Sequence, residues 1–285
     1  MSQARPPDEE AFSLKDLQRF DDVLRARTGM SFGETKRYYV ERRLRDLIQL
    51  SGAASLDAYL NRLRGDAAEV QAVINSFTVN ETYFYREDHQ FRCLSNDILP
   101  EIVSHRGPGD KVRIWSLPCA TGEEAYSIAL WLLENWRMVD AYNVEIVGSD
   151  IDTRALDDAR AGLYDERAVG RLPAEVLDEY FEPRPGGFSQ IIADLIESVT
   201  FTAANLVDQP SMRANGAFDV IFCRNALIYF DDASRRIAAR NLYDSLNPGG
   251  FLCLGHSESM SRMSRHFTQR RFEDAIVYQR PGPAR

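Results

Sequence analysis

The sequence has few residues of the types that bind structural metals or form disulfides. Its four cysteines and four histidines are scattered, and no Cys-x-x-Cys pair occurs. Structural zinc sites use closely spaced cysteines and histidines, and disulfide frameworks use many cysteines in a short chain. We therefore expect no bound metal and no disulfides, and we expect most of the cysteines to pack as small apolar side chains.

Long apolar runs and an excess of positive charge are also missing. No run approaches the roughly 20 apolar residues that cross a bilayer, and the first twelve residues lack the apolar core of a secretory signal. These absences predict a cytoplasmic protein without direct membrane insertion. The net charge of −9 argues against nucleic acid as the main partner. With 285 residues, the chain can bury the core of one or two domains.

The stretch from Val112 to Asp150 has the order of half a nucleotide-binding sheet. A β-branched run at 112–115 leads into a loop of small residues at 118–122, a helical apolar pattern follows, and a second β run at 144–148 ends in Ser149-Asp150. Strand, glycine turn, helix, strand and acid are the parts of a doubly wound α/β unit. In such a sheet, a carboxylate at the end of the second strand accepts hydrogen bonds from ribose hydroxyls, which points to Asp150.

The loop after the first strand does not suit a dinucleotide. It lacks the G-x-G-x-x-G pattern, and Glu123 and Glu124 at the start of the helix would repel a pyrophosphate. Plain stabilisation of the helix dipole is an alternative explanation for these two acids. A nucleoside without phosphates and with positive charge fits the pattern better. S-adenosylmethionine has a sulfonium, an ammonium and a ribose diol, and it is the expected cofactor.

The N-terminal part predicts a small all-helical domain. Residues 1–12 resemble a disordered tail, and residues 13–76 contain helical patterns at 13–28, 33–50, 56–63 and 67–76. One side of the second helix is apolar, and the other carries basic residues. This basic side is either a solvated face or a docking face for an acidic protein. Its candidate docking residues are Lys36, Arg37, Arg42 and Arg45.

The remainder predicts a mostly parallel sheet. An aromatic linker and a connecting helix occupy 77–110, and a domain at 111–282 adds strands at 199–202, 218–223 and 251–254 and a terminal hairpin at 267–279. Strands alternating with helices predict a doubly wound, Rossmann-like α/β sheet, here with an antiparallel end. Residues at about 162–198 are too many for a loop and predict an inserted subdomain.

Six short motifs then occur in order. They are Asn80-x-Thr82-x-x-x-Arg86, residues 120–127, Ser149–Asp152, Asn205-Leu206, residues 222–225 with 228–231, and Gly255–Glu258. Together they resemble the CheR-type chemotaxis receptor methyltransferases, over about residues 13 to 280. This resemblance implies an S-adenosylmethionine-dependent protein-glutamate O-methyltransferase, with S-adenosylhomocysteine as product and the cytoplasmic signalling domain of methyl-accepting chemoreceptors as partner.

The resemblance also assigns roles to single residues. Glu124, rather than Glu123, would hold the methionine end of the cofactor, and Asp150 would hold the ribose. It favours the docking interpretation of the basic helix. Arg86 and Tyr229 are candidates for contact with the reacting carboxylate, although a structural ion pair and a packed aromatic are their alternatives. The other implied cofactor-binding residues are Asn80, Thr82, Arg86, Asn205, Leu206, Arg224 and Asn225.

The implied reaction needs little acid–base help. A glutamate with a pKa of about 4.3 is ionised at pH 7 and needs no general base, which agrees with the lack of a Ser/His/Asp arrangement. Two departures from the family pattern are Ala125, where many relatives have proline, and a short segment at 183–187, which puts docking of a receptor tail in doubt. Two alternatives stay open: a cofactor-binding signalling scaffold without turnover, and a methyltransferase with another protein substrate. A monomer is expected.

Overall fold

The computed structural model describes residues 12–33 and 36–282, so residues 1–11 of the predicted tail lie outside the described residues. The described residues begin with four α-helices: α1 (Leu14–Thr28), α2 (Arg37–Ser51), α3 (Leu56–Arg62) and α4 (Ala67–Phe77). Ser13 starts α1 with a capping box, in which its hydroxyl accepts from the amide of Asp16 at 3.1 Å. Gly29 ends α1 at a φ of 77°, a left-handed conformation that glycine adopts without strain.

The linker after α4 leads into a helix with three parts. These are α5 (His89–Cys93), the π-helical turn η2 (Leu94–Ile98) and α6 (Leu99–Val103). The sequence pattern predicted one uninterrupted helix here, and the π turn was not foreseen. Leu94, Ile98 and Leu99 are all fully buried, so this helix is firmly packed against the sheet domain.

Seven strands form the main sheet in the order β6-β2-β1-β7-β8-β10-β9. The first five are parallel, and β10 is antiparallel to both of its neighbours, which confirms the predicted doubly wound α/β fold with an antiparallel end. Chain order reverses between β1 and β7. The strands are β1 (Lys111–Ser116), β2 (Asn143–Asp150), β6 (Val199–Ala203), β7 (Phe218–Cys223), β8 (Leu246–Leu254), β9 (Thr268–Arg271) and β10 (Ile276–Gln279).

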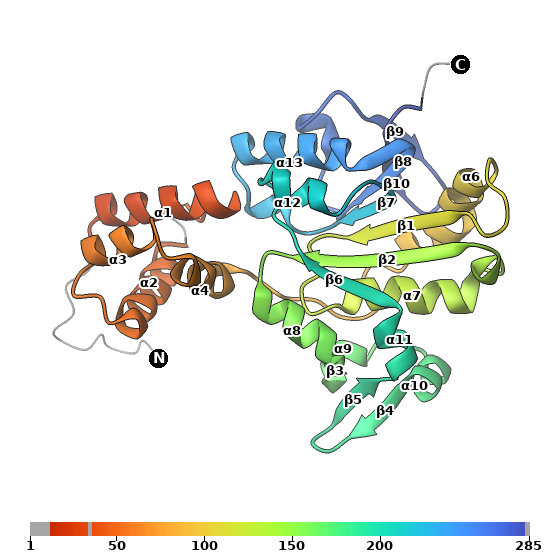
Figure 1. Ribbon diagram of the computed structural model, residues 1–285, viewed down its shortest axis with the longest axis horizontal. Helices are drawn as coiled ribbons and strands as arrows, with labels where there is room; N and C mark the ends of the chain where they lie inside the picture. The colour runs from red at the N-terminus through yellow and green to blue at the C-terminus, as the bar shows by residue number, and fades with distance from the viewer. Residues whose placement is uncertain (1–11, 34–35, 283–285) are drawn as a thin grey trace.

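Helices cover both faces of this sheet, as Figure 1 shows: α12 (Gln209–Ala214) and α13 (Asp232–Asp244) lie above it, and α7 (Glu123–Asn135) and α8 (Thr153–Ala161) lie below. Successive strand residues point to opposite faces. Trp115 and Ile221, paired across β1 and β7, therefore belong to one core cluster, and Ile114 and Val220 belong to the other.

The core of the helical domain continues into one face of the sheet domain. Phe20 and Phe77 belong to the same apolar cluster as Trp115. Met30 forms a β-bridge with Phe230, and the α1–α2 segment donates a hydrogen bond from the Ser31 amide to the Tyr229 carbonyl at 3.0 Å. The four-helix unit is thereby packed against the carboxyl ends of the strands.

The insertion at 162–198 has its own small antiparallel sheet, in the order β3-β5-β4. It lies below the main sheet in Figure 1. Its elements are β3 (Leu163–Tyr164), α9 (Glu166–Val169), α10 (Ala174–Tyr180), β4 (Phe181–Arg184), β5 (Phe188–Ile191) and α11 (Ala193–Glu197). The 3₁₀ turns that lie wholly within the described residues are η3 (Val139–Ala141), η4 (Leu227–Tyr229) and η5 (Met260–Arg262).

Two local features differ from the sequence expectation. Helix α12 was not foreseen. Strand β8 begins at Leu246, before the predicted strand at 251–254. A register shift separates the pair Leu246–Phe218 from the pair Phe251–Val220 and makes the extra residues of β8 bulge. None of the described helices is long and apolar enough to span a membrane.

Candidate functional site

A pocket opens where the strand order reverses, at the carboxyl ends of the parallel strands. Ligands of open α/β sheets bind at this switch point. The loops after β1, β2, β6 and β7 form most of its wall, and the helical domain and the linker after α4 contribute the rest. The lining residues are Thr28, Met30, Thr78, Val79, Asn80, Leu117, Pro118, Ala120, Asp150, Ile151, Ala204, Asn205, Leu206, Asn225, Ala226, Tyr229 and Phe230.

Asp150 lies at the end of β2, in the pocket wall, and is 3% exposed. Its Oδ2 accepts from the amide of Ala120 at 2.8 Å, and its Oδ1 accepts from the amide of Asp152 at 2.9 Å. Burial raises the pKa of Asp150 to about 6, while these amides oppose the rise. The carboxylate is thus ionised at pH 7 and held in a fixed orientation at the pocket.

Asp152 holds Asn80 beside the pocket. The motif Ser149–Asp152 includes this residue, but the sequence analysis gave it no role. The Asp152 Oδ2 accepts from Asn80 Nδ2 at 2.9 Å and from the Thr78 hydroxyl at 2.5 Å. Its Oδ1 caps α8 through the amides of Arg154 and Ala155. One carboxylate therefore joins the linker to the start of α8. An acid directly before a predicted helix indicates an N-cap, and this pattern was the sequence signal for Asp152.

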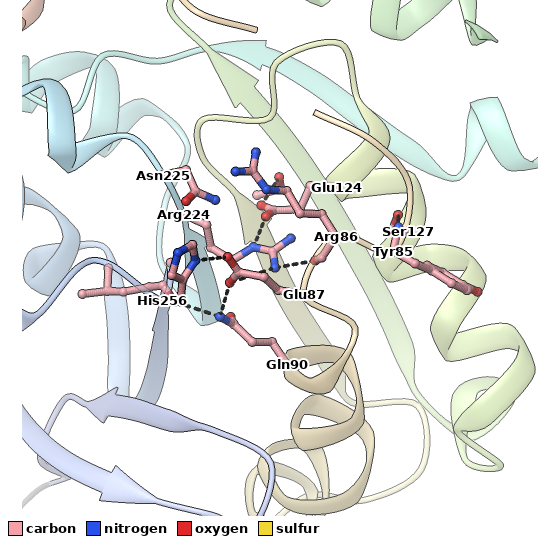
Figure 2. Close-up of polar contacts among 12 residues, drawn as sticks. Tyr85, Arg86, Glu87, Gln90, Glu124, Ser127, Arg224, Asn225 and His256 are labelled. Carbon is pink, nitrogen blue, oxygen red and sulfur yellow. Dashed lines mark hydrogen bonds and ion pairs between the residues drawn. The ribbon is translucent and has the colours of Figure 1, made fainter. Parts of the chain in front are cut away.

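Arg224 and Glu124 form a buried ion pair behind the pocket (Figure 2). The Arg224 Nε donates to Glu124 Oε2, and the Ser116 hydroxyl donates to Glu124 Oε1 at 2.6 Å. The Arg224 Nη1 donates to the Arg86 carbonyl at 2.7 Å. Neither Arg224 nor Glu124 lines the pocket. The guanidinium connects β7, the start of α7 and the linker, so its observed contacts are structural.

Glu87, which the sequence analysis did not single out, completes this cluster. Its Oε1 lies 2.8 Å from His256 Nδ1, and its Oε2 accepts from Gln90 Nε2 at 2.9 Å and lies 3.7 Å from Arg224 Nη1. Burial acts to raise the pKa of Glu87, but His256 and Arg224 outweigh it and hold this pKa below the ordinary value. No local sequence pattern marks Glu87, because all of its partners except Gln90 are distant in the chain.

The backbone on either side of Arg86 is left-handed. Tyr85 has a φ of 57° and Glu87 a φ of 58°, conformations that cost free energy for side chains of this kind. The Tyr85 amide donates to the Ser127 hydroxyl of α7 at 3.0 Å, and Arg224 binds the carbonyl between the two residues. The surrounding ion pair and hydrogen bonds therefore fix this part of the linker.

The two candidate catalytic residues lie near each other but in different settings. Tyr229 lines the pocket, and burial raises the pKa of its hydroxyl while the charge of Arg86 acts to lower it. Arg86 does not line the pocket. Its Nη1 donates to the Glu81 carbonyl at 2.8 Å, and its guanidinium lies 5.7 Å from the Tyr83 ring. Tyr229 is a protonated donor at pH 7.

Glu258 shapes the loop after β7 that presents Asn225. Its carboxylate accepts from the amides of Asn225 at 2.8 Å, Leu227 at 2.7 Å and Gly255 at 2.9 Å. Asn225 has a φ of 59°, which asparagine tolerates better than most residues. A Cβ at Gly255 would lie 2.9 Å from the Asn225 amide nitrogen, so this close approach requires glycine.

The remaining predicted cofactor residues divide between the pocket and its support. Asn205 lines the pocket, but its Nδ2 donates to the Arg27 carbonyl at 2.7 Å and its Oδ1 accepts from the Val207 amide at 3.1 Å. Leu206 is a buried apolar part of the wall. Thr82 is half-buried in the linker and does not line the pocket.

The four predicted docking residues are not equivalent. Lys36 and Arg42 are exposed, and the Lys36 ammonium lies 5.1 Å from the Tyr229 ring. Arg37 binds Glu41 at 3.0 Å and the Phe12 carbonyl at 2.9 Å. The half-buried Arg45 places its guanidinium 5.6 Å from the Phe12 ring. Arg37 and Arg45 therefore hold the start of the described chain against α2.

The composition of the pocket suits a nucleoside without phosphates. Asp150 can accept from a ribose diol, Asn80 and Asn225 supply amides, and Leu117 and Leu206 supply apolar walls. Among the described lining residues there is no lysine, arginine or histidine, the side chains that usually bind phosphates. S-adenosylmethionine, which is cationic and carries no phosphate, fits this set of groups.

Comparison with known proteins gives the family. The profile described as the CheR methyltransferase all-alpha domain matches residues 15–78, and that of the CheR methyltransferase SAM binding domain matches residues 80–276. The chain belongs to the CheR methyltransferase family. The predicted family, the enzyme class and the cofactor S-adenosylmethionine are thereby confirmed.

Named relatives agree over nearly the whole chain. Chemotaxis protein methyltransferase 2 of Vibrio cholerae is 48% identical and covers 93% of both chains. Chemotaxis protein methyltransferase Cher2 of Pseudomonas putida is 33% identical over 93% of this chain and 97% of its own. Chemotaxis protein methyltransferase 1 of Pseudomonas aeruginosa is 34% identical over 92% and 97%. The similarity thus includes the helical domain as well as the sheet domain.

Proposed function

We propose that this enzyme transfers a methyl group from S-adenosylmethionine to glutamate side chains in the cytoplasmic signalling domains of methyl-accepting chemoreceptors, forming methyl esters. The observation that carries the proposal is family membership across both domains together with relatives named as chemotaxis protein methyltransferases. The protein acts as a monomer in the cytoplasm, where those receptor domains lie. Its domains are a helical docking domain at 13–76, a linker and helix at 77–110, and a catalytic domain at 111–282.

The pocket residues would divide the cofactor between them. Asp150 accepts from the ribose hydroxyls, and Asn205 and Leu206 border the adenine. Asn80 and Asn225 contact the polar parts of the cofactor from the linker and from the loop after β7. Support for these roles is their place in the pocket wall. Thr82, Arg86, Glu124 and Arg224 lie outside that wall, and we propose that they approach the methionine end of the cofactor.

The reaction depends on positioning. When bound, the cofactor supplies an electrophilic methyl group on its sulfonium. The receptor glutamate is already ionised at pH 7 and needs no base. Tyr229 donates its hydroxyl to the incoming carboxylate and orients it, and Arg86 adds positive charge on the same side. The buried walls exclude water. Such orientation is a large source of rate acceleration when two reactants meet in a fixed geometry.

The exposed face of α2 would receive the receptor. Lys36 and Arg42 are exposed, and Arg37 and Arg45 support the same helix. The position of Lys36 beside Tyr229 supports this assignment, because a receptor bound to α2 would reach the pocket.

Methyl transfer to purified receptor signalling domains tests the proposal. Labelled S-adenosylmethionine should label at least one receptor of a panel, and glutamate-to-alanine changes in that receptor should abolish the label. The protein should run as a monomer in sedimentation. Cofactor binding with no transfer to any receptor would instead support a scaffold, and label that remains after the glutamates are removed would indicate another protein target.

A further inference from the structure

A second groove lies next to the pocket, on the other side of the η4 turn. It holds about 750 Å³ and is lined by η4, the start of α13 and the segment 256–263. Leu227 and Ile228 border this groove, whereas the next residue, Tyr229, borders the pocket. A single short turn therefore separates the groove from the proposed site of methyl transfer.

The groove carries positive charge that its acids do not neutralise. Glu258 is occupied by three backbone amides, and Asp232 pairs with Arg235 at 3.3 Å. Arg236 and Arg262 are exposed, line the groove, and have no ion pair with any described residue. Two exposed guanidinium groups thus line the groove, one from α13 and one from η5.

Several other exposed arginines are paired with acids, whereas some, such as Arg137 and Arg213, are not. On the same helix the exposed Arg240 pairs with Asp244 at 3.3 Å. Arg160 pairs with Asp157 at 2.9 Å, and Arg184 pairs with Glu182 at 2.7 Å. The whole chain has a net charge of −9, so the unpaired cations in the groove are opposite in sign to the net charge of the protein.

Cations also lie on the other side of Tyr229, where Lys36 approaches its ring at 5.1 Å. Tyr229 therefore lies between the start of α2, through Lys36, and the groove, through Leu227 and Ile228. Ile228, which is 43% exposed at the groove edge, adds an apolar contact between them. This arrangement is complementary to an acidic polypeptide with an apolar side chain near its reacting residue.

We infer that the groove binds acidic side chains of the protein substrate that flank the methylated glutamate, so that the substrate lies across η4. The inference rests on the proposed function. A helical substrate rises about 5.4 Å per turn, so acids one or two turns from the reacting glutamate would reach Arg236 and Arg262 while that glutamate stays at Tyr229.

The test compares two double charge reversals. Arg236→Glu with Arg262→Glu changes the groove. Arg137→Glu with Arg213→Glu is the matched control, because these exposed arginines lie just after α7 and in the last turn of α12, at the amino-terminal edge of the sheet. Receptor methylation is measured over a range of receptor concentrations, and the Kd for S-adenosylmethionine is measured by calorimetry.

The groove variant should raise the KM for the receptor about tenfold, the scale of two exposed charge pairs turned repulsive. Its kcat at saturating receptor and its Kd for the cofactor should match the wild type, and the control should stay within about twofold. Replacing the flanking receptor acids with lysine should restore activity to the groove variant.

The outcomes separate the two proposals. If the wild type methylates the receptor but the groove variant behaves like the control, the groove inference is wrong and the proposed function stands. If the lysine-bearing receptor gives no recovery, direct contact with the acids is likewise excluded. If the wild type labels no receptor, the proposed function itself fails.

Discussion

Two groups of charged residues lie on either side of the pocket, and they differ in how they use charge. Behind the pocket, Arg224 and Glu124 are 6% and 9% exposed and are joined to the linker by fixed hydrogen bonds. On the helical domain and in the neighbouring groove, Lys36, Arg42 and Arg236 are exposed. A buried charge is costly when it loses its partner, whereas an exposed one is screened and contributes little to stability. The first group should control folding and geometry, and the second should control encounter with the substrate.

The largest effect is expected from Arg224→Ala. This change leaves the buried Glu124 carboxylate without its cation and removes the donor to the Arg86 carbonyl. The free energy of unfolding should fall by about 3–5 kcal/mol. Arg160→Ala, which removes an exposed pair with Asp157, should cost no more than about 1 kcal/mol. Urea denaturation of both variants measures these losses. Similar losses of unfolding free energy in the two variants would contradict the distinction between the buried and the exposed group.

Glu123 makes the free energy of unfolding depend on pH. It is 4% exposed, and burial raises its pKa from an ordinary 4.5 to about 7. The folded state holds this proton more tightly than the unfolded state, so stability present below about pH 4.5 is lost as the pH rises through 7. Glu123→Gln should remove this loss, which amounts to about 3 kcal/mol. Unfolding measured from pH 4.5 to 8 should show the variant gaining on the wild type, and a constant difference would contradict the assignment.

Asp150→Ala tests the contact with the cofactor. Loss of a charge-assisted hydrogen bond should weaken S-adenosylmethionine binding by roughly 1.5–3 kcal/mol. Because the pKa of Asp150 is raised to about 6, wild-type affinity should also fall as the pH drops through 6, where the carboxylate gains a proton. Calorimetry that finds unchanged affinity in the variant would remove Asp150 from the binding site.

The smallest effect is expected at the exposed side. Arg42→Glu with Arg45→Glu should slow receptor methylation several-fold and leave cofactor affinity unchanged, since exposed pairs contribute about 0.2–1 kcal/mol each. The wild-type rate should decrease with added salt, because screening acts within about 8–10 Å. Arg42→Glu alone is the sharper variant, since Arg45 also contacts Phe12. Equal rates at all salt concentrations would identify α2 as an ordinary solvated face.

Local patterns explain what the sequence could predict. The strands at 112–115, 144–148 and 218–223 were recognisable because β-branched and aromatic runs end in small or polar residues, and Asp150 follows directly from that reading. The apolar side of α2 followed from helical spacing, and Val40 and Leu44 are buried as expected. The interpretation of the six motifs rested on family resemblance.

The cluster behind the pocket could not be predicted in the same way. Arg224 is 100 residues from Glu124 and 138 from Arg86 along the chain, so no spacing pattern relates them. Glu87 resembles an ordinary surface acid in the sequence, and Glu258 belongs to a motif that gave it no role. Only the fold brings Glu87 to His256 and Glu258 to the amides after β7. The bulge in β8 likewise depends on its pairing with β7.

The nature of the product tests the central claim most directly. In the proposed mechanism Tyr229 and Arg86 orient a carboxylate, and no base is needed because the acceptor is an ionised glutamate. Receptor labelled by the enzyme should therefore release volatile methanol in mild alkali, because esters hydrolyse there and N-methyl groups do not. Complete release of the label as methanol is the predicted result. Label that survives alkali would show methylation on nitrogen and would contradict the mechanism, even with the fold and the cofactor unchanged.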